Sequence, residues 1–140
     1  FPDLITSMSD LRRLAALHGL ARVCETVSDV AASDDQRIRL CALLDGRVMA
    51  RMEEYLKEPF EDIRHGVFKL LRALAKHVFG LRFLLARAGL VEFLLDRRTE
   101  TTKYGLEWKF DLIKVGFRIV VVIVCDVLVG LSWSLTKLYV

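Results

Sequence analysis

The chain has 140 residues, enough for one domain, with 54% apolar side chains, 28% charged side chains and a formal net charge of +3. The near balance of basic and acidic residues argues against a dedicated nucleic-acid binder, and two prolines and eight glycines are too few for a loop-rich or low-complexity protein. The three cysteines lie far apart, which favours a reducing compartment: we expect a cytoplasmic protein, with the nucleus as a second location.

Apolar residues recur at helical spacing along most of the chain, which predicts an all-α protein. Ser9 suits the N-cap of a first helix, and Pro59 suits the first turn of a third. A kink is expected near Gly89. The expected helical segments are residues 10–27, 36–58, 59–79, 81–97 and a fifth that starts at 104.

Helices of this length, joined by short polar breaks, are typical of repeat proteins. Moving the sequence by 51 positions places Arg13 on Arg64 and Leu17 on Phe68, and moving it by a further 42 places Phe68 on Phe110. These offsets bracket the period of roughly 40–47 residues of HEAT and armadillo units, if the first unit carries a loop insertion. The pattern predicts an armadillo/HEAT-like α-solenoid fragment, in which each repeat buries its apolar face against its neighbours.

The third predicted helix carries the residues best suited to contacts between repeats and with a partner. Asp62 and Arg64, just after Pro59, resemble the acidic residue and the arginine that form a ladder between neighbouring HEAT repeats. The second helices of such repeats line the concave binding surface, so a charged stripe on this helix is the candidate partner-binding face. The stripe consists of His65, Lys69, Arg72 and Lys76. It is either an ordinary solvated helix face, since long charged side chains commonly cover helix surfaces, or a docking site for an acidic partner.

No catalytic or cofactor-binding pattern is present in the sequence. The histidines lack the HExxH spacing of zinc sites, the cysteines form no CxxC pair, and no glycine-rich phosphate loop occurs. Adjacent acidic pairs such as Glu53-Glu54 point to different faces of a helix and cannot share a substrate. We therefore expect a protein that is not an enzyme and that has no metal and no cofactor.

Two aromatic residues and two cysteines are expected to lie in the core. Trp108 and Phe110 could anchor an interface, but the favoured interpretation is that they pack between repeats. Cys24 and Cys41 fall on apolar stripes, which is typical of cysteines that act as small core residues.

The chain from Pro59 onward resembles a known family. Three segments carry the resemblance: PFEDIRHGVFKLLRALAKH, RFLLARAGLVEFLLDR and RTETTKYGLEWKFDLIK. They are similar to the C-terminal part of the non-ATPase regulatory subunit 5 family of the 26S proteasome, most specifically in GLVEFLLDRRTETTK at residues 89–103. The resemblance covers residues 59–114. It implies a non-enzymatic solenoid that acts as an assembly chaperone of the regulatory-particle base, with AAA-ATPase subunits and associated base subunits as partners.

The sequence changes character after the repeat segment, residues 1–114. Residues 115–140 form an atypical apolar tail, rich in β-branched residues that suit a helix poorly, and we expect this tail to lie outside the fold. Read-through of an intron or an erroneous gene model is the hypothesis for it. The rival is a membrane anchor at residues 115–135, since about 20 residues span a bilayer. In such an anchor Asp126 would raise the free energy of membrane insertion by about 2.5–3.5 kcal/mol, and each Val or Ile would lower it by about 0.3–0.6 kcal/mol. The sum is near zero. The alternative function is therefore a tail-anchored helical-repeat adaptor at a membrane.

Overall fold

The computed structural model describes residues 10–26, 33–44 and 46–139, and every regular element in these ranges is helical. The all-α prediction is confirmed, while Ser9, the predicted N-cap, lies outside the described residues. The elements are α2 (Asp10–Thr26), α3 (Asp34–Leu43), α4 (Gly46–Tyr55), α5 (Glu61–Ala75), α6 (Val78–Leu85), α7 (Leu90–Leu95), the short 3-10 helix η1 (Arg97–Thr99) and α8 (Lys103–Tyr139).

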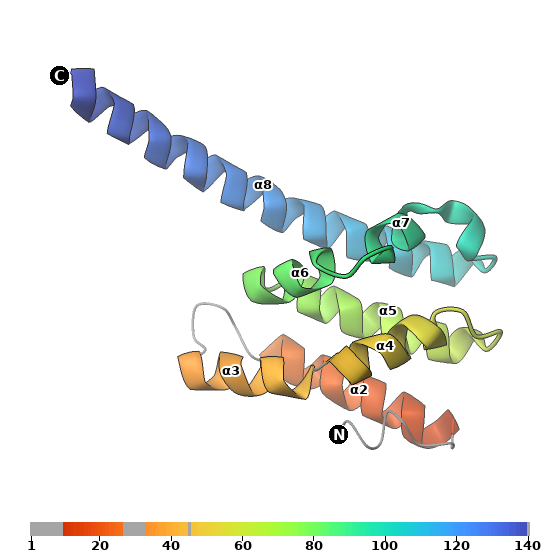
Figure 1. Cartoon of the computed structure of the whole chain (residues 1–140). Helices are drawn as coiled ribbons and strands as arrows, with labels where there is room; N and C mark the ends of the chain where they lie inside the picture. The colour runs from red at the N-terminus through yellow and green to blue at the C-terminus, as the bar shows by residue number, and fades with distance from the viewer. Residues whose placement is uncertain (1–9, 27–32, 45, 140) are drawn as a thin grey trace.

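Three long helices, α2, α5 and α8, lie side by side and run in the same direction (Figure 1), with α5 packed between the other two. The shorter pairs α3–α4 and α6–α7 return the chain from the end of one long helix to the start of the next. Glu61 begins α5 51 residues after Asp10 begins α2, and Lys103 begins α8 42 residues after Glu61. These are the two offsets found in the sequence, so the predicted solenoid-like architecture is confirmed.

Two of the predicted helices are each split in two. Residues 36–58 form α3 and α4, and residues 81–97 form the end of α6 together with α7 and the start of η1. Gly89 separates α6 from α7 with a φ of 79°, a left-handed backbone that residues with a Cβ rarely adopt, so the chain breaks there rather than kinking. The predicted helices end at residue 79 and begin again at 81, but Gly80 between them lies inside α6. A Cβ at Gly80 would lie 2.2 Å from the carbonyl oxygen of Leu74, so only glycine lets α6 approach the end of α5 this closely.

The core surrounds α5, because this helix has a long neighbour on either side. The largest fully buried side chains of the core are Leu17, Leu20, Cys24, Val48, Met49, Met52, Val67, Phe68, Leu70, Leu71 and Leu74. His77, just after α5, donates from Nε2 to the carbonyl oxygen of Cys24 at 2.6 Å, and this bond satisfies a carbonyl in the last turn of α2. The repeats are therefore joined by a polar contact as well as by apolar packing.

The predicted core cysteines and aromatics have mixed outcomes. Cys24 is buried as predicted, and burial raises the pKa of its thiol to about 12, whereas the side chain of Cys41 lies outside what the structure describes. Trp108 packs against the core as predicted. The prediction for Phe110 is wrong, since this side chain is 64% exposed. It occupies a core position of the repeat, but the described residues contain no further long helix to cover it.

Helix α8 continues well beyond the other elements and crosses Lys114 without interruption (Figure 1). Val115 and Ile119 still pack against the core, while the apolar side chains from Val120 to Leu131 are largely exposed. The β-branched run is thus helical in spite of its composition, and the division of the chain at residue 114 stays a prediction. Within the described ranges no helix, α8 included, is both long and apolar enough to cross a membrane.

Candidate partner-binding face

The predicted partner-binding stripe lies along one side of α5 and contacts α2 and the loop that leads into α8. His65 Nε2 lies 3.4 Å from the hydroxyl oxygen of Thr102, immediately before α8. At the other end of the stripe, Lys76 Nζ lies 3.7 Å from a carboxylate oxygen of Glu25 on α2. The stripe therefore reaches from α2 across α5 to the loop before α8.

The two central residues of the stripe are half-buried. Lys69 lies near enough to His18 of α2 that its positive charge, after the larger effect of burial, lowers the pKa of that imidazole. Arg72 buries its Nε atom without a hydrogen-bond partner in the structure, while the residue as a whole remains partly accessible. A partner with acidic side chains could pair with these cations.

The repeat extends this face onto α8. The positions 42 residues after the stripe are Glu107, Asp111, Lys114 and Arg118, and all four are exposed. By this equivalence, the α8 part of the face carries two carboxylates near the start of α8 and two cations, Lys114 and Arg118, farther along. We call the four residues Arg72, Lys76, Lys114 and Arg118 the basic end. Lys114 and Arg118 were not among the residues predicted for the face. The 42-residue offset is the signal in the sequence that points to them.

Arg64, one of the two predicted ladder residues, forms a buried ion pair with Glu100 in the loop before α8. Its Nε and Nη2 atoms each donate to one carboxylate oxygen at 3.0 Å, and its Nη1 donates to the carbonyl oxygen of Glu58 at 2.8 Å. The side chains are 9% and 0% exposed. Asp62, the other predicted ladder residue, is exposed in the first turn of α5.

A second ion pair repeats this arrangement one unit earlier. Arg13 of α2 donates from Nη1 to Glu58 at 2.8 Å, and its guanidinium lies 5.0 Å from the centre of the Tyr55 ring. Arg13 and Arg64 are both the fourth residue of a long helix, and Glu58 and Glu100 both lie three residues before the next long helix begins. We call the pairs Arg13–Glu58 and Arg64–Glu100 the rungs. The sequence offsets aligned the arginines, but their glutamate partners were not predicted.

Glu100 is the most strongly held charge in this part of the molecule. Besides Arg64, its carboxylate accepts hydrogen bonds from the backbone N–H of Thr101, from the N–H of Thr102 and from the Thr102 hydroxyl, each at 3.1 Å. Burial raises its pKa, but the hydrogen bonds from Arg64 and Thr102 and the Arg64 charge outweigh this and lower the pKa to about 2. Gly105 completes the site, because a Cβ there would lie 2.3 Å from the carboxyl carbon of Glu100.

The lowered pKa of Glu100 predicts a loss of stability in acid. The folded state binds this proton more weakly than the unfolded state, so the contribution of Glu100 is complete above about pH 4.5 and falls as the pH drops towards 2. The loss should reach roughly 3 kcal/mol across this window. Urea unfolding at several pH values measures it. Glu100→Gln should flatten the dependence, whereas Glu54→Gln, at an exposed pair with Arg51, should leave it as in the original chain.

Lys109 is a buried cation that the sequence did not reveal. Its Nζ atom donates to the carbonyl oxygens of Phe93 at 3.3 Å and Asp96 at 3.0 Å, and also to the Thr99 hydroxyl. Burial lowers its pKa, while the charges of Glu100 and Asp96 oppose that shift. Lys109 therefore satisfies carbonyls at the end of α7 and fixes η1 against α8.

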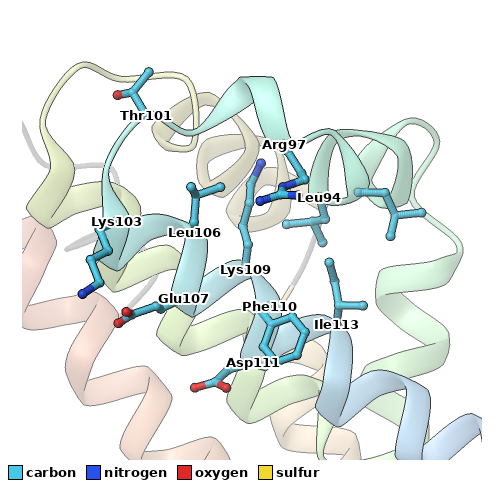
Figure 2. A pocket seen from close by; sticks show the side chains of 11 residues that line it. Leu94, Arg97, Thr101, Lys103, Leu106, Glu107, Lys109, Phe110, Asp111 and Ile113 are labelled. Atoms are coloured by element: carbon cyan, nitrogen blue, oxygen red, sulfur yellow. The ribbon is translucent and has the colours of Figure 1, made fainter.

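An open groove of about 1020 Å³ lies between the α7–η1 segment and α8 (Figure 2). Its lining residues are Leu94, Leu95, Arg97, Thr101, Lys103, Leu106, Glu107, Lys109, Phe110, Asp111 and Ile113. The lining combines apolar side chains such as Phe110 and Ile113 with charged side chains of both signs. Such a groove suits an amphipathic segment of a protein better than a small charged ligand. Within the described ranges, no cluster of His, Cys, Asp or Glu side chains is arranged to hold a metal ion.

Comparison with known proteins identifies the family. A family model described as proteasome non-ATPase 26S subunit matches residues 8–121, a wider range than the residues 59–114 on which the sequence resemblance was based. The match includes α2, α5, both return segments and the first half of α8, and so it contains the stripe and both rungs. No curated protein and no solved structure matches the chain. The chain belongs to the proteasome non-ATPase 26S subunit family.

Proposed function

We propose that the chain is a non-catalytic chaperone that assists assembly of the base of the proteasome regulatory particle. It holds a module that contains AAA-ATPase subunits and associated base subunits, and by occupying that module it blocks premature docking. The observation that carries this proposal is the family match over residues 8–121. The resemblance to the subunit 5 family supplies the finer assignment, including a cytoplasmic and nuclear location.

The architecture supports a binding role. Side-by-side long helices present an extended surface of the kind that repeat proteins use to hold a partner. The armadillo/HEAT-like character of the repeat belongs to the same proposal, with its second helices lining the binding surface. In this arrangement the basic end receives an acidic segment of the partner, since Lys76, Lys114 and Arg118 are exposed there.

The experiment is purification of the tagged chain from cells, followed by identification of the proteins that accompany it. The expected result is recovery of proteasome ATPase subunits without the mature core particle. Recovery of neither, or of intact proteasomes alone, would contradict the chaperone role.

Charge reversal at the basic end tests the binding face. The double variant Lys76→Glu/Arg118→Glu should weaken binding of the ATPase module about tenfold, because two attractive contacts become repulsive. Arg82→Glu makes the same kind of change at an exposed residue of α6 that is not one of the four residues of the basic end, and it should bind normally. Circular dichroism establishes that both variants remain folded. If both variants bind as the original chain does, the face lies elsewhere.

A further inference from the structure

The groove between the α7–η1 segment and α8 has walls that the fold already holds in place. Lys109 of α8 binds the carbonyl oxygens of Phe93 and Asp96 on the opposite wall. The Arg64–Glu100 pair fixes the loop that connects η1 to α8. A ligand that enters the groove therefore does not have to order its walls, which lowers the cost of binding.

Apolar side chains on both walls of this groove face solvent. Leu95 of α7 is 58% exposed and Phe110 of α8 is 64% exposed, while Ile113, one turn beyond Phe110, is half-buried. The lining takes in residues 103–113 of α8, a length of about 15 Å at the rise of a helix. An apolar face about three helical turns long would cover these side chains.

The same groove carries two pairs of charges of opposite sign. We call Arg97 of η1 and Lys103, the first residue of α8, the cationic pair, and Glu107 and Asp111 the acidic pair. Glu107 and Asp111 are four residues apart and so lie along one side of α8 (Figure 2). All four side chains are exposed, and none forms an ion pair with another residue of the described ranges. Both pairs are thus available to charges on a ligand.

The surroundings of the groove favour a helix over other kinds of ligand. Every regular element in the described ranges is helical, so these ranges offer no sheet edge to an extended peptide. Lys109 is occupied by two carbonyls and the Thr99 hydroxyl, so its ammonium is not available to a small anion. Small organic ligands need enclosure of most of their surface, which an open groove does not provide. An amphipathic helix, by contrast, places rows of charge on either side of an apolar stripe.

We infer that the groove receives an amphipathic helix of a partner protein, with acidic residues directed to the cationic pair and basic residues to the acidic pair. The apolar stripe of that helix packs on Leu95 and Phe110. The inference defines the chemistry of the bound segment, and it does not depend on the proposed function.

Fluorescence anisotropy with the purified full chain and three synthetic peptides tests the charge pattern. The peptides are helix-forming, about 15 residues long, and share one apolar stripe. The first carries glutamate on one flank and lysine on the other, the second lysine on both flanks, and the third glutamate on both. The mixed peptide should bind about tenfold more tightly than either uniform peptide, because each uniform peptide places like charges together. Absence of binding, or equal binding of all three, would overturn the inference.

Two variants with matched controls locate the bound peptide. Phe110→Ala should weaken binding of the mixed peptide about tenfold. Tyr104→Ala should not, since Tyr104 is 68% exposed on the same helix but does not line the groove. Arg97→Glu should make the all-lysine peptide bind about tenfold more tightly than it binds the original chain. Arg98→Glu should leave that affinity unchanged, because Arg98 is 91% exposed, pairs with Asp96 and does not line the groove.

Other occupants of the groove give different results. Equal weakening by Phe110→Ala and Tyr104→Ala would place the peptide elsewhere on α8 and overturn the inference. So would flotation of the chain with phosphatidylcholine vesicles, or self-association in sedimentation velocity, if Phe110→Ala abolished it, since lipid or a second copy would then occupy the groove. Circular dichroism establishes that every variant remains helical.

Discussion

Replacing Arg64 with methionine is expected to lower the free energy of unfolding by about 3–5 kcal/mol, because removing one partner of a buried ion pair leaves the other charge without compensation. Glu100 would keep its bonds to Thr101 and Thr102, but its side chain is 0% exposed and could not recruit bulk water. Urea unfolding at pH 7, followed by circular dichroism, measures the change.

The other rung provides the control. Arg13→Met removes the equivalent arginine from a pair whose side chains are 15% and 27% exposed, so its loss should be closer to 1 kcal/mol. The double variant Arg64→Met/Glu100→Gln should lose less than the two single variants combined, since the two residues stabilise the same contact. Equal effects of Arg64→Met and Arg13→Met would show that burial does not strengthen the second rung.

Truncating Phe68 to alanine is expected to cost about 3–5 kcal/mol, through lost apolar burial and the cavity that remains. Phe68 is 1% exposed and lies on the central helix of the core. Phe110 is its equivalent one repeat later, and Phe110→Ala should change the stability by no more than about 0.5 kcal/mol, because an exposed ring leaves no cavity.

Both truncations should be measured in the full chain at the same protein concentration. Thermal and urea unfolding give the two values. A large loss for Phe110→Ala would mean that its ring is covered in solution.

The helical repeat was predictable because the same apolar spacing recurs in α2, α5 and α8. The offsets of 51 and 42 residues mark the starts of these helices. The breaks between α3 and α4 and between α6 and α7 were less visible, since apolar residues continue through them and the chain turns only where packing demands it. The chain stays helical after Lys114 although Val and Ile are poor helix formers. Relative to alanine, each costs at most about 0.7 kcal/mol in a helix, and extending an established helix is easier than starting a new one.

The candidate site was predictable only in part. The stripe could be read from one helix, because its members share a face of α5. The glutamates of the rungs could not, since Arg64 and Glu100 are 36 residues apart and meet only when the loops are placed by tertiary packing. The role of Lys109 could not be predicted either, because its partners include backbone carbonyls, which every residue has and which no sequence pattern marks. Phe110 was misassigned because its spacing matches a core position for which the described chain supplies no covering helix.

The rungs also bear on how the molecule responds to mechanical force. Each rung joins an arginine of one long helix to the loop just before the next long helix. Each therefore connects neighbouring units only. The position on α8 equivalent to Arg13 and Arg64 is Leu106, which cannot form an ion pair, so the series of fastenings ends at that helix. Pulling α8 away from an anchored α5 would load the Arg64–Glu100 pair and not the Arg13–Glu58 pair. Separation of α8 from α5 would thus break one rung and leave in place the pair that holds the start of α5 to α2.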